Sequence, residues 1–463
     1  MTRFFRVFVP ATAVVLLVSE ILLITSAFIL AVYITLGVDP WVNLVEDGGF
    51  MNLAPVLVTI LLGMHFNDLY SQFYIKSRIV LLQQLALVMG AAFLVQGLLS
   101  YISPDLRVSA RVMAIGSVLA IVAIYFWRVL FNMFALNVMG RDRLLLVGGS
   151  PLLEDIAKHL EEHPELGLEV AGYVDDAHQP GERLSGGKVL GTIPDLKEIV
   201  LATKPTRVVV GMSERRNRMP VAELLELRFG GHIIEEAAAT FERVCGRVCL
   251  KELRPSQLIY SGELGPRPQS LIVQTVLNRL AAAVGIVVAS PIMLLTALAV
   301  KLSSPGPILY RQVRVGLDDV PFTVYKFRSM RADAEKGTGA VWASKDDPRV
   351  TKVGKILRKL RFDELPQLFN TLKGEMSMVG PRPERPEFVK ELSKKIPYYR
   401  QRHCVRPGIT GWAQINFKYG DTLEDTMTKL EYDLYYIKNM SLSLDTYIVF
   451  HTVKAMLLSR GSQ

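Results

Sequence analysis

The sequence is poor in cysteine and in charged residues, and each shortage excludes a class of protein. Only three of 463 residues are cysteine, which rules out a disulfide framework, and no Cys/His cluster has the spacing of a zinc site. Charged residues make up 21% of the chain and hydrophobic residues 50%. This balance excludes a disordered chain and argues against a fully soluble enzyme.

The charge is unevenly distributed along the chain. The formal net charge is +9, and residues 301–463 alone hold 28 Lys and Arg against 18 Asp and Glu. The rest of the chain is therefore close to neutral, and the C-terminal third is suited to anionic partners. At about 150 residues per domain, the length corresponds to roughly three domains.

Four apolar runs in the N-terminal part each approach the roughly 20 residues that a membrane-spanning helix needs. They are Val7–Leu36, Phe50–Phe66, Ile79–Leu99 and Val112–Leu136. A signal peptide is the alternative for the first run, but its apolar stretch is too long and no small-residue cleavage site follows it. Basic residues flank the outer ends of this group and the first loop is acidic, which favours a cytoplasmic location for both ends.

A soluble waist follows, at about residues 141–260, in which strand and helix patterns alternate. Strands are predicted at 143–150, 170–174 and 207–210, and helices at 152–162, 196–202 and 221–229. This alternation predicts a parallel α/β sheet. The first strand ends in Gly148-Gly149-Ser150-Pro151, which lacks the G-x-G-x-x-G spacing of a dinucleotide site. We therefore expect a structural or regulatory Rossmann-like module rather than an NAD-binding one.

A fifth apolar segment, Leu280–Leu302, is also long enough to cross a bilayer, with Arg279 before it and Lys301 at its end. Its middle holds Ser290 and Pro291, and a proline there predicts a sharp bend because it removes a helical hydrogen bond. Cations at both ends favour one membrane face, which predicts a re-entrant helix-break-helix hairpin. A kinked spanning helix is the alternative.

The residues suited to chemistry are concentrated in four short blocks. The blocks are Lys326-Phe-Arg-Ser-Met330, Leu357-Arg-Lys-Leu-Arg-Phe-Asp-Glu-Leu-Pro-Gln-Leu368, Val379-Gly-Pro-Arg-Pro-Glu384 and Arg406-Pro-Gly-Ile-Thr-Gly-Trp412. In the second block Asp363 and Glu364 precede Pro366, a pattern typical of a helix N-terminus. An ionised Asp there can attack phosphorus or hold a divalent cation.

Four cations from these blocks are the candidate contacts for a diphosphate and its developing charge. They are Lys326, Arg328, Arg358 and Arg382. The pairs Asp318-Asp319 and Asp346-Asp347 are alternative metal sites, although both have the pattern of exposed turns. The apolar residues of Leu442–Leu458 fit either an interfacial helix or a core helix.

Together and in this order, the four blocks resemble the bacterial polyprenyl-phosphate sugar-1-phosphate transferases, the monotopic phosphoglycosyl transferases that initiate exopolysaccharide, capsule and O-antigen assembly. The resemblance covers about Leu271–Met456, and the N-terminal helices and the waist resemble the large members of that family. One departure is Phe362, where the family usually has a smaller aliphatic or polar residue; we expect it to pack against its neighbours.

The resemblance implies a role for each matching residue. Asp363 would attack the sugar-bearing phosphate of a nucleoside-diphosphate sugar, release a nucleoside monophosphate such as UMP, and pass the phosphosugar to polyprenyl phosphate in a ping-pong reaction. Glu364 would support the second step or the metal, and Mg²⁺ would bind at Asp363. The break at Ser290 and Pro291 matches the family's re-entrant helix.

The expected fold is an α/β membrane protein: a four-helix transmembrane bundle at 1–138, a Rossmann-like domain at 139–262, and a mainly helical catalytic domain at 263–463 with its re-entrant hairpin at about 278–302. The resemblance places the catalytic domain on the cytoplasmic face of the bacterial inner membrane. It allows a homodimer and predicts no nucleic-acid partner. The rival functions are a non-catalytic scaffold for polysaccharide assembly and an oxidoreductase or epimerase acting through the waist.

Overall fold

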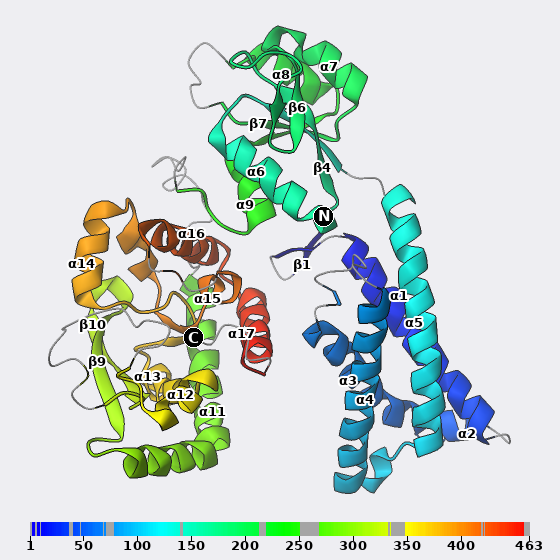
Figure 1. The fold of residues 1–463 in the computed structure, drawn as a ribbon, viewed down its shortest axis with the longest axis vertical. Helices are drawn as coiled ribbons and strands as arrows, with labels where there is room; N and C mark the ends of the chain where they lie inside the picture. Colours follow the sequence, from blue (N-terminus) through cyan, green and yellow to red (C-terminus); the bar gives the residue numbers. More distant parts are fainter. Residues whose placement is uncertain are drawn as a thin grey trace. The chain divides into compact units, whose positions relative to one another are not determined.

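The computed structural model describes residues 2–4, 7–9, 11–36, 40–46, 48–67, 69–70, 78–138, 142–212, 219–250, 268–331, 334, 348–417, 420 and 422–457. Apart from the first seven residues, these belong to two compact units, Phe8–Ala237 and Ala238–Gln463. Two short strands, β1 (Thr2–Phe4) and β2 (Val7–Val9), begin the chain (Figure 1).

Long apolar helices form the first part of the chain, as the sequence predicts. They are α1 (Ala11–Leu36), α3 (Gly49–Phe66), α4 (Arg78–Ile102) and α5 (Ala110–Val138), with an unpredicted short helix α2 (Pro40–Val45) after α1. Together with α11, described below, these make five helices in the described residues that are long and apolar enough to cross a membrane. The chain therefore has the composition of a membrane protein.

A charged pair is buried among these apolar helices. Glu20 on α1 is fully buried and Arg128 on α5 nearly so. The guanidinium donates to both carboxylate oxygens at 2.6 and 3.1 Å, and to the carbonyl oxygen of Leu69 at 2.8 Å. Because a buried charge is tolerated only when paired, this contact fixes α1 against α5.

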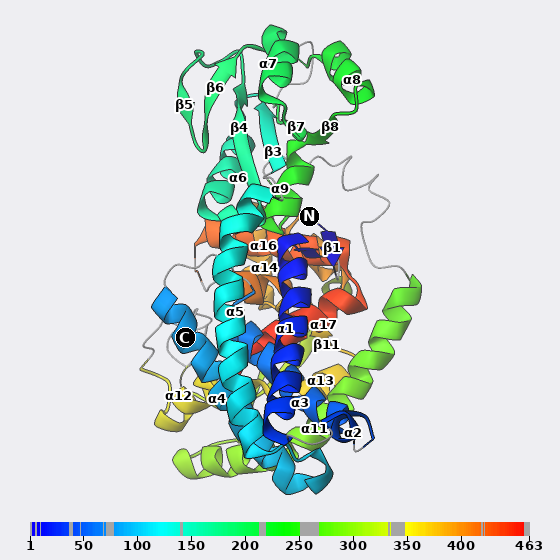
Figure 2. The same cartoon turned by 90° about the vertical axis from the view of Figure 1, so that its right-hand side faces the viewer.

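The waist contains a six-stranded sheet in the order β5-β6-β4-β3-β7-β8, whose strands lie side by side in Figure 2. Its elements are β3 (Asp142–Val147), α6 (Pro151–Glu162), β4 (Leu168–Val174), β5 (Arg183–Leu184), β6 (Gly187–Gly191), α7 (Leu196–Thr203), β7 (Arg207–Val210), α8 (Val221–Phe229) and β8 (Ile233–Glu236). All neighbouring pairs are parallel except β5 with β6. The predicted parallel α/β sheet is confirmed.

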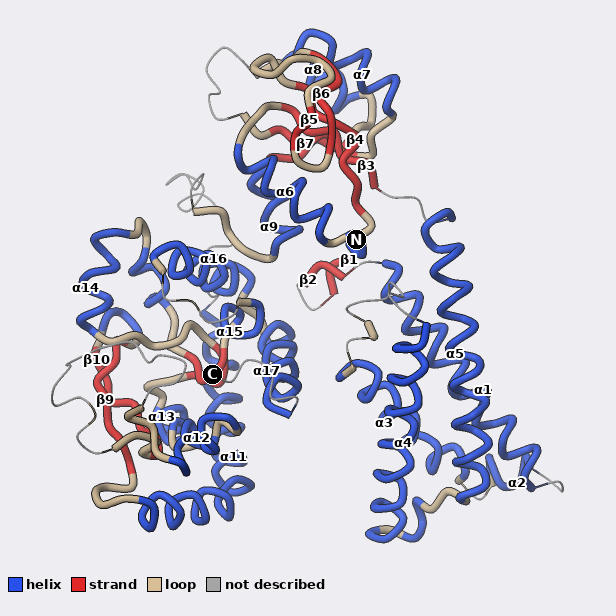
Figure 3. The backbone as a smooth tube through the Cα atoms, viewed as in Figure 1, coloured by secondary structure: helices blue, strands red, loops and turns tan. Residues whose placement is uncertain are grey.

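The second unit is largely helical, with a two-stranded antiparallel ribbon at one side (Figure 3). Its elements are α9 (Ala237–Cys245), α11 (Pro268–Ser303), β9 (Leu309–Val315), β10 (Pro321–Phe327), α12 (Lys352–Lys359), α13 (Gln367–Lys373), β11 (Ser377–Val379), α14 (Pro386–Lys395), β12 (Gly408–Thr410), α15 (Trp412–Asn416), α16 (Leu423–Asn439) and α17 (Leu442–Leu457). Leu444 and Ile448 of α17 are fully buried, so one face of this helix belongs to the core.

Helix α11 starts twelve residues earlier than the apolar run predicts, and it bends sharply between two arms (Figures 1 and 2). Pro291 lies inside it, which supplies a physical cause for the bend. Most of its large apolar side chains remain exposed, among them Val287, Val288 and Leu294. This surface suits lipid rather than water.

The segment that ends the waist in the sequence packs on the second unit in the structure. The Trp412 indole donates to the carbonyl oxygen of Gly246 at 2.7 Å, and Arg247 pairs with Glu431 at 3.0 Å. Lys438 pairs with Glu242 of α9 at 2.8 Å. Residues 238–250 therefore form a strap over α15 and α16.

Candidate active site

Asp363 and Glu364 lie in a single 3-10 turn, Phe362–Glu364, between α12 and α13. Arg361 begins the turn with a left-handed backbone (φ 59°), and Pro366 precedes the first residue of α13. The carboxylates therefore lie just ahead of α13, next to the helix N-terminus at which the sequence predicts them. Both residues are buried, each 8% exposed.

Glu364 is held by three cations. Its Oε1 accepts from Lys326 Nζ at 2.7 Å and from Arg382 Nη2 at 2.8 Å, and Arg361 Nη1 lies 3.6 Å from Oε2. Burial favours the protonated form, but these cations outweigh it and hold the pKa of Glu364 well below its usual range. Glu364 therefore stays ionised and fixes the positions of the Lys326 and Arg382 side chains.

Asp363 differs from its neighbour because its carboxylate makes no hydrogen bond or ion pair with any residue in the described part of the chain. Burial and the adjacent Glu364 carboxylate raise the pKa of Asp363 to about 6, against the opposing charges of Lys326, Arg358 and Arg382. At neutral pH it is therefore mostly ionised, and its oxygens remain available to a reactant.

Lys326 reaches Glu364 from strand β10, opposite Tyr310 of β9. Burial lowers the pKa of Lys326, although Glu364 opposes this effect. The fully buried Asn370 of α13 fixes the strand beside the carboxylate turn: it accepts from the Tyr325 N–H at 3.2 Å and donates to the Thr323 carbonyl at 2.7 Å.

Arg382 comes from the loop after β11. One of its terminal nitrogens contacts Glu364, and the other donates to Gln414 Oε1 at 3.1 Å. Its side chain is 38% exposed, so part of it is open to solvent. Its planar guanidinium fork suits a phosphate.

Arg358 on α12 lies near enough to Asp363 to lower its pKa, and donates to Ser329 Oγ at 3.0 Å. Helix α12 can approach this strand end closely because residue 354 is glycine; a Cβ there would overlap the carbonyl oxygen of Ser329. The Lys326–Met330 block thus holds the helix that carries Arg358.

Arg328, the fourth predicted phosphate contact, lies away from this group. Its guanidinium is buried and donates to main-chain carbonyls where α11 ends: Ser304 at 2.6 Å, Pro305 at 2.9 Å and Val300 at 3.3 Å. These bonds satisfy orphan carbonyls of a helix C-terminus. In the structure, Arg328 therefore binds the C-terminal end of α11. A phosphate contact for Arg328 stays a prediction.

The segment from the carboxylate turn to α13 packs against both arms of α11. Phe362 and Leu365 pack against the cluster of Val300, Phe327 and Leu357, as expected for Phe362. On the other arm, a Cβ on Gly285 would lie 3.4 Å from Leu368 of α13.

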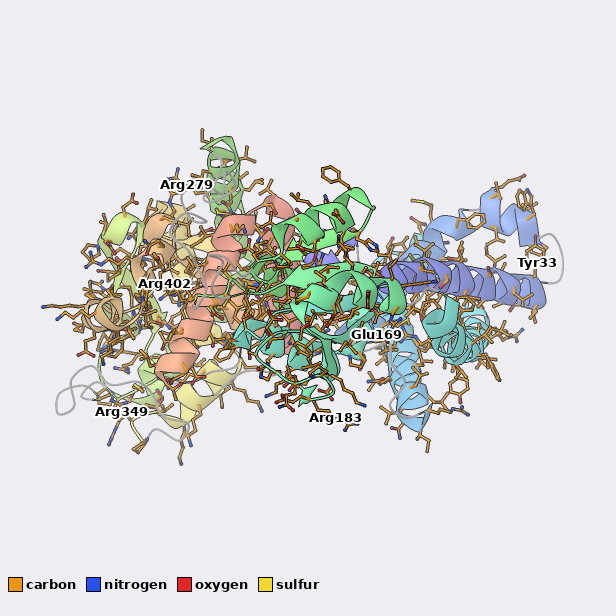
Figure 4. The ribbon with its side chains drawn as sticks, turned by 90° about the horizontal axis from the view of Figure 1, so that it is seen from above. Tyr33, Glu169, Arg183, Arg279, Arg349 and Arg402 are labelled. Atoms are coloured by element: carbon orange, nitrogen blue, oxygen red, sulfur yellow. The ribbon has the colours of Figure 1, made fainter. Side chains whose placement is uncertain are left out.

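Ser290 of α11 donates to the carbonyl oxygen of Val287 at 2.8 Å beside Pro291. Arg279, on the first arm of this helix, is labelled in Figure 4. Ser290 and Pro291, the predicted break residues, are therefore part of α11, the helix on which the turn of Asp363 and Glu364 packs.

Of the alternative acidic pairs, only Asp318-Asp319 lies in the described residues, and Asp319 pairs with residues outside this site. Asp319 pairs with His403 at 2.6 Å and Arg400 at 3.6 Å, whereas Asp346 and Asp347 lie outside the described residues. Sequence reasoning missed Arg361 and Gln414. The spacing of three residues between Arg361 and Glu364 was a usable signal for an ion pair, whereas no local pattern marks Gln414.

Comparisons with known proteins show the family to which the chain belongs. Residues 269–459 match the family model described as bacterial sugar transferase, and residues 65–223 match one described as CoA-binding domain. The chain is 48% identical over 222 residues to the UDP-N-acetylgalactosamine-undecaprenyl-phosphate N-acetylgalactosaminephosphotransferase of Aeromonas hydrophila, covering 48% of this chain and 52% of that protein. The match therefore spans about half the length of that relative.

Two further relatives are named UDP-glucose:undecaprenyl-phosphate glucose-1-phosphate transferase. The one from Xanthomonas campestris pv. campestris is 34% identical over 332 residues, covering 68% of this chain and 66% of that protein. The one from Caulobacter vibrioides is 43% identical over 211 residues, covering 44% of this chain and 79% of that protein. The chain therefore belongs to the bacterial sugar transferase family, the polyprenyl-phosphate sugar-1-phosphate transferases that its four blocks resemble.

Proposed function

We propose that this protein transfers a sugar-1-phosphate from a UDP-hexose to polyprenyl phosphate, which releases UMP and forms a polyprenyl-diphosphate sugar. The observation that carries the proposal is the Asp363 carboxylate. It is buried and makes no polar contact with a described residue, yet it lies within the electrostatic reach of Lys326, Arg358 and Arg382. The names of the relatives supply the donor and acceptor classes.

In the first half-reaction, an Asp363 oxygen attacks the phosphorus that bears the sugar. A bond from the carboxylate to phosphorus forms, the bond to the bridging oxygen breaks, and UMP leaves with that oxygen. In the second half-reaction, a phosphate oxygen of the polyprenyl phosphate attacks the same phosphorus and the carboxylate leaves. The pKa of about 6 supports this role, because it gives a mostly ionised nucleophile at neutral pH.

The cations stabilise the charge that develops on the phosphoryl oxygens. The Arg382 side chain is partly exposed, and the hydrogen bond of Lys326 to Glu364 orients its ammonium group. In this proposal Glu364 does not exchange protons. It holds the two cations at fixed positions, which reduces the reorganisation needed when the diphosphate binds.

The donor set also fits Mg²⁺. Within the described residues no group of three or more acidic, His or Cys side chains forms a complete metal cage. Mg²⁺ commonly needs only one or two carboxylates, with waters and substrate phosphates completing its shell. Asp363, whose oxygens bond to no residue in the described ranges, would hold it with the diphosphate, where it would neutralise phosphate charge.

The hydrogen bonds at the two ends of α11 support a re-entrant hairpin. On the first arm, Gln274 donates to Asp445 and Asn278 donates to Ser377 Oγ at 2.8 Å. The end of the second arm is bound by Arg328. Both ends therefore attach to the same compact unit, which argues against a helix that passes through the bilayer.

In this arrangement a polyprenyl tail stays in lipid while its phosphate meets a soluble donor at the interface. We place the catalytic unit on the cytoplasmic face of the bacterial inner membrane. We further propose that α1, α3, α4 and α5 form a four-helix transmembrane bundle and that the waist is a Rossmann-like domain. The three parts follow the predicted limits 1–138, 139–262 and 263–463, except that residues 238–250 pack on the catalytic unit. A homodimer is compatible with this organisation.

The test uses the full-length protein in nanodiscs with polyprenyl phosphate, Mg²⁺ and a panel of UDP-hexoses and UDP-N-acetylhexosamines. We expect UMP release with at least one donor and its loss in Asp363→Asn. Asp155→Asn, at an exposed position of α6, is the matched control. With donor alone, mass spectrometry of digested enzyme should show a phosphosugar on the peptide that contains Asp363.

A folded protein that releases no UMP from any donor would overturn the proposal in favour of the scaffold. UMP release without a phosphosugar on Asp363, even in rapidly quenched samples, would retain the transferase and overturn the two-step mechanism.

A further inference from the structure

The first arm of α11 carries an arginine on a largely apolar surface. Arg279, labelled in Figure 4, is exposed and lies inside the apolar span Leu271–Ser303. Ile272, Val276 and Leu280 are also exposed, and their spacing places them on the same face of the helix as Arg279. A cation on such a lipid-facing surface needs a counter-ion or must reach the aqueous interface.

A second arginine belongs to the fourth sequence block, and the proposed chemistry does not use it. Arg406 Nε donates to the carbonyl oxygen of Gly374 at 2.9 Å, and its Nη1 donates to Thr275 Oγ1 at 3.0 Å. A Cβ on the same glycine would lie 2.8 Å from Arg279 Nη2. Both guanidinium groups therefore lie against Gly374, one from α11 and one from the loop before β12.

The two arginines line a common cavity between the first arm of α11 and the end of α13. Its volume is about 20 Å³, and Asn278 and Ser377 add polar groups to its wall. This volume holds about one water-sized group, so one oxygen of an anion fits inside while the rest stays at the edge, where Arg279 is exposed. Gly374 follows α13 and Asp363 precedes it, so the cavity and the carboxylate turn lie at opposite ends of this helix.

No carboxylate in the described residues neutralises these two cations. Arg279 makes no hydrogen bond or ion pair with a described residue, and the hydrogen bonds of Arg406 go to the neutral oxygens of Gly374 and Thr275. Glu375, which follows Gly374, accepts instead from Asn370 at 2.7 Å. Two like charges held against one residue favour an anion between them, and the planar guanidinium fork matches the oxygens of a phosphate.

We propose that this site binds the phosphate of an anionic phospholipid from the surrounding bilayer. The phosphate lies between the Arg279 and Arg406 guanidinium groups, and the acyl chains lie along Ile272, Val276 and Leu280. Basic pockets beside membrane helices bind anionic headgroups in this way. The lipid fixes the first arm of α11 against the end of α13. This binding involves no group transfer and does not depend on the proposed transferase reaction.

The experiment titrates the full-length protein in detergent micelles with phosphatidylglycerol and measures the first bound lipid by native mass spectrometry. We expect saturable binding that Arg279→Gln weakens about tenfold, because charge-assisted hydrogen bonds to the phosphate are lost. Arg279→Lys should recover part of the affinity, since it keeps the charge but not the planar fork. Lys301→Gln, at an exposed cation of the same helix, is the matched control and should keep the affinity within about twofold.

Phosphatidylcholine and polyprenyl phosphate test the source of the phosphate. Phosphatidylcholine has no net charge, so we expect weaker binding that Arg279→Gln leaves unchanged. Polyprenyl phosphate also fits the proposed catalytic site, so only the part of its binding that Arg279→Gln removes counts here. A larger loss for polyprenyl phosphate than for phosphatidylglycerol would overturn the phospholipid as occupant in favour of the acceptor lipid.

Because Arg279 is exposed and bonds to no described residue, Arg279→Gln should fold with the thermal midpoint of the native protein. Equal affinity of the two folded proteins for phosphatidylglycerol would overturn the site. Asp363→Asn should bind phosphatidylglycerol as the native protein does, which separates this site from the transferase reaction. A loss of phosphatidylglycerol binding in Asp363→Asn would place the lipid at the carboxylate turn and contradict the proposal.

Discussion

Arg402 donates a hydrogen bond from Nη2 to the main-chain carbonyl of Arg382 at 2.9 Å. The same guanidinium forms a buried ion pair with Asp433 at 2.8 Å and donates to the Tyr399 hydroxyl at 2.9 Å. Arg402 is labelled in Figure 4. The buried ion pair of Arg402 and Asp433 therefore fixes the loop that carries Arg382, through the main chain of that loop.

Asp433→Asn should damage both stability and activity. It leaves the Arg402 cation buried without its counter-ion, which costs about 3 kcal/mol in comparable pairs. We expect a lower thermal midpoint and, at temperatures where the variant stays folded, UMP release reduced at least tenfold because Arg382 is displaced. Glu424→Gln, at an exposed position on the same helix, is the control. Full activity in folded Asp433→Asn would show that the pair does not position Arg382.

Asp363 should set the pH dependence of the first half-reaction. With a pKa of about 6, the ionised fraction falls about tenfold between pH 7 and pH 5, and UMP release with donor alone should fall with it. Single-turnover rates across this range provide the measurement. A rate that stays constant down to pH 5 would contradict the assignment.

The same pKa predicts an effect of Asp363→Asn on stability. A carboxyl whose native pKa is raised opposes folding once it ionises, so stability should decline as the pH rises through 6. Asp363→Asn should therefore raise the thermal midpoint at pH 7.5, and this gain should shrink at pH 5. An equal midpoint for both proteins at pH 7.5 would argue against a destabilised nucleophile.

The pair of Glu20 and Arg128 should stabilise the packing of α1 on α5. Glu20→Gln leaves a buried cation, and we expect a loss of about 3 kcal/mol, measured as a lower thermal midpoint in nanodiscs. The double variant Glu20→Leu with Arg128→Met should lose less, because both charges are gone. If the single variant is as stable as the native protein, the pair contributes nothing to packing.

Gly354→Ala should disturb the site although it adds one methyl group. The Cβ would overlap the Ser329 carbonyl, so α12 must shift together with Arg358. We expect a loss on the order of 1–3 kcal/mol and reduced UMP release. Gly90→Ala on α4 is the control, because a Cβ there meets nothing within 4 Å. Equal behaviour of the two variants would refute the close approach.

Pro291→Ala should straighten α11 and carry its end away from the cytoplasmic face. A cysteine placed at Lys301 in a cysteine-free background reports its position through a membrane-impermeant thiol reagent. We expect labelling from the cytoplasmic side to fall in Pro291→Ala, together with activity. Pro55→Ala, a proline substitution inside α3, should leave the labelling unchanged. Unchanged labelling and activity in Pro291→Ala would exclude a role for this proline in the bend.

The parts of the fold that the sequence predicts well are those with one dominant local signal. The bounds of β7 and α8 agree residue for residue, since a continuous apolar run and an amphipathic pattern define them. Strand β9 was missed because its exposed and half-buried residues alternate and several are Arg or Gln. The start of α11 was missed because residues 268–279 carry the polar side chains that bind the rest of the unit.

The residues of the candidate site also differ in how well the sequence predicts them. Glu364 with Lys326 and Arg382 could be predicted because their motifs are short and dense in charge. The placement of Arg328 could not, since a carbonyl-binding arginine and a phosphate-binding arginine look alike in a sequence. Arg402 and Asp433 are 31 positions apart, and only the tertiary structure brings them together.

The strap of residues 238–250 determines where a working fragment can begin. A fragment that starts at residue 263, or at the family match from 269, would lack Gly246, the acceptor for the Trp412 indole. It would also leave Glu431 without Arg247 and uncover the stacked rings of Trp412 and Tyr435. Any fragment or fusion of the catalytic unit must therefore include the strap. The smallest fragment that we expect to fold is longer than the family match at residues 269–459.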